Sequence, residues 1–114
     1  MAVLTKQTVN EAGQIITYSD AGVAGDSFAY DSNAVVLIDN TGGSTVVVTI
    51  ANQETNPLSC AGKGLVTKSD TTLSVAAGLK GTFAFLPSPY KDTGGSVQMT
   101  YDQATGVKVA VITK

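Results

Sequence analysis

Apolar and polar residues alternate along most of the chain, which is the pattern of strands with one buried face. In three segments every second residue is large and apolar: "STVVVTI" (44–50), "SVQMTYD" (96–102) and "VKVAVIT" (107–113). A fourth segment, "AVVLIDN" (34–40), is apolar on both faces up to Ile38. Such a strand is expected to be central in its sheet or covered on both sides.

Shorter elements complete the prediction. "SFAYD" (27–31) and "LVTKS" (65–69) each predict a short strand, and a first strand is expected at Gln14 to Tyr18. "NTGGS" (40–44) predicts a hairpin loop in which the two glycines can adopt positive φ. The longest loop is expected to run from about Ala51 to Lys63.

The segment "TLSVAAGLKGTFAF" (72–85) alternates, turns at glycine and alternates again, which predicts a hairpin. Leu73 and Val75 share one face before the turn, and Phe83 and Phe85 share one after it. An isolated hairpin is only marginally stable in water. This apolar face therefore needs a second sheet to cover it.

About eight strands with frequent turns and no helical periodicity predict an all-β fold, an antiparallel β-sandwich of the jelly-roll or immunoglobulin-like type. A small closed barrel is the alternative. Residues 1–25 are polar and broken by glycine, and we expect an extended N-terminal arm with a first short strand there. Residues 26–114 are expected to form the sandwich domain.

Composition excludes several classes of partner. Only 14% of the 114 residues are charged, the net charge is −2, and every basic residue is a lysine. Proteins that bind nucleic acid usually carry a basic patch with arginine, so no nucleic-acid partner is expected. No apolar run approaches the ~20 residues that span a bilayer, and the start of the chain does not resemble a signal peptide. We expect a protein made in a cytoplasm that does not bind membranes.

Catalytic chemistry is not expected either. The chain has no histidine, which removes the common triads and the commonest metal ligand. Cys60 is the only cysteine, so no internal disulfide can form, and we expect its side chain to be a small buried hydrophobe. The sequence predicts no enzyme activity, no cofactor and no metal.

Carboxylates and tyrosines offer two weaker possibilities. Asp26 and Asp31 are an odd number of residues apart, which places them on opposite faces of a strand. Asp39 and Asp102 open turns and Asp20 precedes a glycine-rich loop, where aspartate usually caps the backbone. These positions do not predict a glycosidase pair.

Four tyrosines, Tyr18, Tyr30, Tyr90 and Tyr101, offer a sugar-stacking platform or packing in a core or interface. Tyr101 shares its parity with Val97 and Met99, and the chain has no tryptophan. Packing is therefore the favoured role.

From Asp26 to Ile112 the order of the segments resembles a family of small virion proteins of tailed phages. Its members have a short F-x-x-D strand, a strand ending in Asn, a hairpin into a VTV-like strand and a strand ending in V-x-A-G. A strand ending in an aromatic, a P-x-x-aromatic-x-D turn and two last strands follow. The corresponding segments here are "FAYD", "VVLIDN", "STVVVTI", "LSVAAG", "FLPSPYKD", "GSVQMTYD" and "VKVAVI".

The resemblance implies a structural virion protein that decorates and cements a bacteriophage capsid by binding the major capsid protein. It implies a homo-oligomer, dimer or trimer, at the capsid surface, made in the host bacterial cytoplasm. Relatives tend to have a Gly-Pro-Phe-type end where this chain has 83–87, "FAFLP". A carbohydrate-binding module and a tail or head–tail connector subunit are the alternatives.

Contacts with other subunits are expected from two segments outside the sandwich pattern, the arm 1–10 and the turn 86–92. The arm cannot build its own core, and its backbone groups need partners, such as a neighbour's sheet edge. The prolines of the turn restrict φ and reduce the entropy lost on docking. The expected contact residues are Val3, Leu4, Val9, Pro87, Pro89 and Tyr90.

Overall fold

The computed structural model describes residues 2–53, 58–60, 64–66, 70–84, 86 and 90–114, with only the backbone of 58–60 and 64–66. Within these residues the regular elements are all strands, and no helix is long and apolar enough to cross a membrane. The strands are β1 (Ala2–Val3), β2 (Lys6–Thr8), β3 (Ser19–Asp20), β4 (Asp26–Ala29), β5 (Val35–Asn40), β6 (Val46–Ile50), β7 (Leu58–Cys60), β8 (Gly64–Val66), β9 (Thr71–Val75), β10 (Lys80–Ala84), β11 (Ser96–Tyr101) and β12 (Val107–Thr113).

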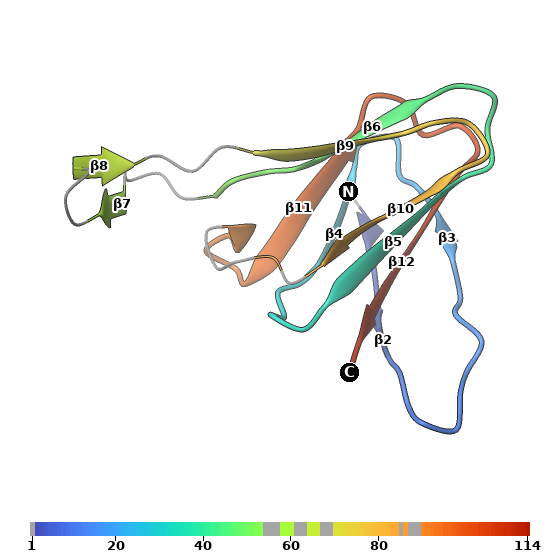
Figure 1. Cartoon of the computed structure of the whole chain (residues 1–114), viewed down its shortest axis with the longest axis horizontal. Coiled ribbons are helices and arrows are strands. Elements are labelled where there is room, and N and C mark those ends of the chain that lie inside the picture. Colours follow the sequence, from blue (N-terminus) through green and yellow to red (C-terminus); the bar gives the residue numbers. More distant parts are fainter. Residues whose placement is uncertain (1, 54–57, 61–63, 67–69, 85, 87–89) are drawn as a thin grey trace.

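Ten of these strands form two sheets that face each other (Figure 1). One sheet has the order β1-β4-β11-β6-β9. The other has the order β10-β5-β12-β2, and β3 pairs with β12 beside β2. Strands β7 and β8 pair only with each other among the described strands and project away from the sandwich (Figure 1). The expected all-β sandwich is confirmed.

The connections identify the kind of sandwich. Along the chain, β4, β5 and β6 lie in alternate sheets, and so do β9, β10, β11 and β12. The order β4-β11-β6-β9 opposite β3-β12-β5-β10, with all of these neighbours antiparallel, is that of a jelly roll made of two Greek keys. Of the two expected sandwich types, the strand order is therefore that of the jelly roll.

The core lies between the two sheets and is filled by alternate residues of both. The three strands with the clearest alternation, β6, β11 and β12, contribute the valines, the isoleucine and the methionine that the sequence pattern predicts. Strand β5 lies between β10 and β12, as its two apolar faces predict. Among the described residues, the largest fully buried apolar side chains are those of Phe28, Val36, Ile38, Val46, Val48, Ile50, Val97, Met99, Val107, Val109 and Val111.

The predicted hairpin at 72–85 is wrong. Its two strands exist as β9 and β10, but they lie in opposite sheets, and the segment between them crosses the end of the sandwich. Alternation predicts which face of a strand is buried, and this is the same for a hairpin and for a crossing connection. Val75 and Phe83 are accordingly both buried, from opposite sheets. Phe85 lies outside the described residues.

The predicted hairpin loop at 40–44 is also a crossing connection, from β5 to β6. Neither of its glycines has positive φ. Gly42 is needed for a different reason, because a Cβ there would lie 2.7 Å from the carbonyl oxygen of Thr105. Glycine here permits the close approach of two loops.

The extended N-terminal arm is not confirmed. Strand β1 pairs in parallel with β4, and β2 pairs in parallel with β12, so the first residues join both sheets and make them mixed. The expected strand at 14–18 is absent, and β3 begins at Ser19. A short polar segment satisfies its backbone groups on the free edges of its own sheets. Residues 2–3, 6–8 and 19–20 therefore pair with strands of the sandwich.

The loop expected at 51–63 contains one strand that the sequence pattern missed. This strand is β7, which pairs with β8 in the register Leu58–Val66 and Cys60–Gly64. The strand expected at 65–69 overlaps β8 at residues 65 and 66, and residues 67–69 lie outside the described part of the chain. The side chain of Cys60, expected to be buried, lies outside the described part of the chain.

Candidate docking surfaces

The six expected contact residues differ in their exposure to solvent. Val3 is 79% exposed and Val9 is 37% exposed, whereas Leu4 and Tyr90 are only 8% and 2% exposed. The two prolines of the turn lie outside the described residues. The exposed members thus come from the first nine residues, and the buried members belong to the core.

Leu4 is buried because the chain crosses from one sheet to the other between β1 and β2. Its backbone N–H donates to the carbonyl of Ser27 over 2.7 Å, and Val9 N–H donates to the carbonyl of Thr113 over 2.8 Å. The polar groups of this segment therefore find partners within the same chain. A neighbour's sheet edge is not needed to satisfy them.

Tyr90 packs into the core, and its hydroxyl is hydrogen-bonded to that of Thr71. A tyrosine that is buried with a satisfied hydroxyl contributes to the stability of its own domain. The sequence pattern missed this because the proline-rich turn carries no periodicity.

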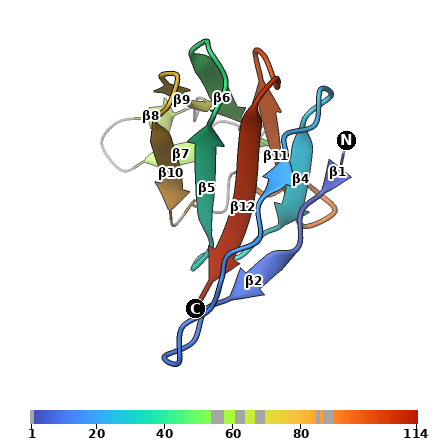
Figure 2. The same cartoon turned by 90° about the vertical axis from the view of Figure 1, so that its right-hand side faces the viewer.

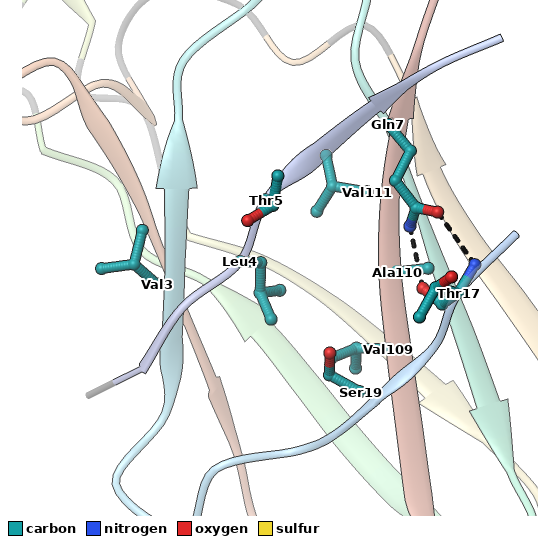
Figure 3. Close-up of a pocket in the computed structure, with 9 residues that line it drawn as sticks. All are labelled: Val3, Leu4, Thr5, Gln7, Thr17, Ser19, Val109, Ala110 and Val111. Carbon is teal, nitrogen blue, oxygen red and sulfur yellow. Dashed lines mark hydrogen bonds between the residues drawn. The ribbon is translucent and has the colours of Figure 1, made fainter.

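A hollow of about 340 Å³ lies where β1 and β2 pass β12 (Figure 3). Gln7 closes one side of it with two hydrogen bonds of 2.8 Å, from its Nε2 to the carbonyl of Thr17 and from the Thr17 N–H to its Oε1. The lining is aliphatic and hydroxyl-bearing, with no charged side chain. Such a hollow offers no acid, base or metal ligand, and suits an apolar group.

The outer face of the β1-β4-β11-β6-β9 sheet carries no charged side chain on its strands, all of which are described. The only charged residue in these strands, Asp26, points inward and is fully buried. Thr49 lies beside both Thr72 and Thr100, on the strands to either side. We call this surface the uncharged face; its residues are Val3, Ser27, Ala29, Val47, Thr49, Thr72, Ser74, Ser96, Gln98 and Thr100.

The outer face of the other sheet carries a row of alternating charge (Figure 2 shows this sheet from outside). Asp20 on β3 lies beside Lys108 on β12, which lies beside Asp39 on β5, which lies beside Lys80 on β10. Lys80 and Asp39 form an ion pair of 2.8 Å, and Lys108 pairs with Asp20. The hydrogen bond that Lys80 donates to Asp39 raises the pKa of Lys80. We call this row the charge ladder.

Two further rows follow the charge ladder, and their side chains on β12 and β5 are aliphatic. Gln7 on β2 and Thr82 on β10 lie at the ends of these rows. Ala110 lies beside Leu37, and in the next row Ile112 lies beside Val35. The side chains of Val35, Leu37 and Ile112 are half-buried, although they point away from the core. We call the charge ladder and these two rows together the ladder face.

The residues on which the expected resemblance to phage virion proteins rests have structural roles here. Asn40, at the end of β5, is fully buried. Its Nδ2 donates to the carbonyls of Ser44 and Val75 over 2.7 and 2.9 Å, and its Oδ1 accepts from Gly42 N–H over 3.1 Å. Its backbone carbonyl accepts from Gly78 N–H over 2.8 Å. One asparagine thus ties together both crossing connections at this end of the sandwich.

Asp31 of "FAYD" and Asp92 of "FLPSPYKD" accept hydrogen bonds from nearby backbone N–H groups. Asp31 accepts hydrogen bonds from Asn33 N–H and the Thr113 hydroxyl over 2.8 and 3.0 Å, and pairs with Lys6 at 3.4 Å. The bond from Asn33 is the main reason that the pKa of Asp31 lies below its usual value. Asp31 therefore joins β2, the end of β12 and a turn.

Asp92 holds the turn before β11. Its Oδ1 accepts from the N–H groups of Gly94 and Ser96, both over 2.9 Å, and its Oδ2 accepts from Gln98 Nε2 over 2.7 Å. The hydrogen bond from Ser96 is the main cause that lowers the pKa of this carboxyl.

The tyrosines do not gather into a stacking platform in the described structure. Tyr101 and Tyr30 pack partly against the core, and the Tyr30 hydroxyl donates to the carbonyl of Leu86 over 3.1 Å. Tyr18 is exposed beside β3, on the opposite sheet from Tyr101. Among the described residues, no three potential metal-ligating side chains come together.

The charge ladder was not predicted from the sequence. The alternation shows that Lys108 and Thr100 point away from the core. Only the register between distant strands reveals which outward residues are neighbours, as for Asp20 and Lys108. No protein-family model, curated protein or solved structure matches this chain.

Proposed function

We propose that this protein is a structural virion protein that decorates a bacteriophage capsid and stabilises it by binding the major capsid protein. The observation that carries the proposal is the uncharged face, a sheet surface whose strands present no charged side chain outward. The Asp92 carboxylate, from the turn before β11, is hydrogen-bonded to Gln98 of this face. The central part of a protein–protein interface is depleted in charge. Burying the strand residues of this face costs no desolvation of ions, so it suits docking onto another protein.

The resemblance to phage virion proteins supplies the partner. The residues that carry the resemblance, such as Asn40 and Asp92, build loops and turns. They support a rigid shape and leave the outer faces free for contacts. Val3, which is exposed beside Ser27 at the edge of the uncharged face, extends that surface into the N-terminal residues.

Cementing a shell needs only a modest contact from each copy. Weak interfaces bury less than about 1,200 Å². Because many copies bind one lattice, linked contacts raise the apparent affinity by roughly 10²–10⁴. A capsid that carries the protein is then expected to rupture at a higher temperature than a capsid stripped of it.

The test is co-sedimentation of the protein with stripped capsids of the phage that encodes it. Thr100→Lys places a cation on the uncharged face, at an exposed strand position. Thr105→Lys is the matched control, at an exposed position in the turn between β11 and β12 and outside both sheet faces. We expect Thr100→Lys to reduce binding at least about tenfold and Thr105→Lys to bind within about twofold of wild type.

Rupture temperature gives the second readout. Adding wild-type protein should raise the rupture temperature of stripped capsids, and Thr100→Lys should not. Capsids that rupture at the same temperature with and without the protein would remove the cement role. Equal binding of the two lysine variants would remove the uncharged face as its surface.

A further inference from the structure

The ladder face has two features that seldom occur together on the outside of a sheet. Its aliphatic rows place Leu37 and Val35 next to Ala110 and Ile112, outside the core. Beside them runs the charge ladder, whose signs alternate over four strands. Opposite charges on neighbouring strands stabilise a sheet. They do not account for the aliphatic rows beside them.

We infer that the ladder face binds the same face of a second copy of this chain, about a two-fold axis that runs parallel to the strands between β12 and β5. Rotation about such an axis reverses the order of the strands in the second copy. Each row keeps its position along the strand direction, so it faces the same row of the other copy. The contact is isologous, because the same patch is used by both copies.

This arrangement places opposite charges together along the whole ladder. Lys108 faces Asp39 of the second copy, and Asp39 faces its Lys108. Asp20 in turn faces Lys80 of the second copy. A row of four alternating charges reversed in this way meets its complement at every position. The charges that would oppose docking on an unrelated surface therefore favour docking on a second copy.

The same rotation brings the aliphatic rows together. Leu37 lies opposite the β12 position of Ala110, which is itself only 3% exposed, and Ile112 meets Val35 of the second copy. Sheets that pack face to face cross at about 30° because of their twist. The central charge pairs, from Lys108 and Asp39, then stay close, and the outer pairs separate towards the solvent. The interface gains an apolar centre and a charged rim, as in other protein contacts.

Tyr18 extends the apolar centre. It precedes β3 and is 38% exposed. Tyrosine is enriched in interfaces because its ring is apolar and its hydroxyl is polar. The face spans four short strands, so the contact is small and the affinity modest.

Sedimentation equilibrium of the full chain tests the inference, from about 10 µM to about 1 mM. We expect a reversible dimer whose dissociation constant lies in this range and rises with salt, because the ladder charges are exposed. Leu37→Lys should weaken dimerisation at least about tenfold. Val47→Lys, a matched change at a half-buried position on the uncharged face, should dimerise like wild type. Thermal unfolding of each variant shows whether it is folded.

Exchanging the positive and negative residues of the charge ladder tests how the two copies are aligned in the dimer. The fourfold variant Asp20→Lys, Asp39→Lys, Lys80→Asp and Lys108→Asp keeps every ion pair within the chain and between its own copies. It should dimerise like wild type and should not form mixed dimers with it, since like charges would meet. Mixing is measured by energy transfer between chains labelled at the N-terminus. Free mixing of the two would overturn the alignment.

Two further outcomes overturn the inference. A wild-type chain that stays monomeric at the highest concentration has no such contact. If a Leu37→Lys variant dimerises normally but no longer binds capsids, the ladder face binds the capsid and not a second copy. The inference does not depend on the capsid role, because Thr100→Lys leaves the ladder face unchanged and should dimerise whether or not it binds capsids.

Discussion

A fully buried aspartate lies in the β1-β4-β11-β6-β9 sheet. Asp26 Oδ2 accepts hydrogen bonds from the Tyr101 hydroxyl and the Gly22 N–H, over 2.6 and 3.0 Å. Its Oδ1 has no hydrogen-bond partner within the described structure. Burial, and then the hydrogen bond to Asp26, raise the pKa of Tyr101 well above its usual value. The tyrosine therefore remains a donor throughout the working pH range.

Tyr101→Phe is expected to destabilise the protein by about 2–3 kcal/mol, because it removes a donor from a buried carboxylate and leaves that group short of partners. The measurement is urea unfolding followed by circular dichroism. Tyr18→Phe is the matched control, since Tyr18 is exposed, and should change the free energy of unfolding by less than about 0.5 kcal/mol. An equal effect of the two changes would mean that the contact with Asp26 contributes nothing.

At the scale of elements, the N-terminal strands close the two sheet edges beside β4 and β12. Strand β1 extends one sheet and β2 extends the other, and the residues between them pass across the opening of the sandwich (Figure 2). Leu4 points into the core from this crossing, whereas Val3 faces the solvent. One segment thus combines a structural residue with a residue available for contacts.

Leu4→Ala and Val3→Ala separate these two roles. Leu4→Ala should lower the free energy of unfolding by about 2–4 kcal/mol, because it leaves a cavity between the sheets. Val3→Ala should change it by less than about 0.5 kcal/mol. Thermal and urea unfolding of both variants provide the measurement. A Leu4→Ala variant as stable as wild type would show that the N-terminal crossing does not pack in solution.

The sequence predicted well which face of each strand is buried, but it predicted poorly which strands pair with each other. The parity of Val46, Val97 and Val109 depends only on the pleat of a strand, so their burial could be predicted from a few neighbouring residues. The pairing of Thr71–Val75 with β6 and of Lys80–Ala84 with β5 depends on contacts far along the chain, which a local pattern does not contain. For this reason the crossing at 76–79 was expected to be a hairpin turn.

The same holds for the candidate surfaces: the exposure of single residues could be predicted, but the grouping of residues from different strands could not. Exposure of Val3 and Val9 could be expected from their place in a polar segment, whereas the burial of Tyr90 depends on Thr71, which belongs to another strand. The uncharged face and the charge ladder each combine residues from at least four strands. They appear only when the register is known.

At the scale of the whole molecule, the two outer faces differ in charge. One sheet presents the uncharged face, and the other presents the ladder face, so a copy that dimerises through the second still exposes the first. Under the two proposals above, a dimer offers two uncharged faces on opposite sides. Because these two faces point in opposite directions, one can lie against a shell while the other faces away from it, so the dimer gains no avidity on a single shell.

Acid should destabilise the molecule as a whole, through the carboxylates that hold its turns and ends. Hydrogen bonds lower the pKa of Asp31 and of Asp92 in the folded state. A lowered pKa adds stability that is fully present above the unfolded value of about 3.9 and is lost as the pH falls through the folded value. The melting temperature should therefore be nearly constant from about pH 5 to 7 with respect to these two groups and fall below about pH 4.

The double variant Asp31→Asn and Asp92→Asn tests this. Asparagine retains one carbonyl oxygen for the N–H groups of Asn33 and Ser96 but does not titrate. We expect the variant to melt below wild type at pH 6, because the ion pair with Lys6 and the charged hydrogen bonds are lost. The difference should shrink as the pH falls to about 2.5, where both aspartates of the wild type are protonated. Glu11→Gln removes a carboxylate from an exposed position and serves as the control for net charge. If the gap between wild type and the double variant stays the same from pH 6 to 2.5, the two aspartates do not link folding to protonation, and acid sensitivity arises from other carboxylates.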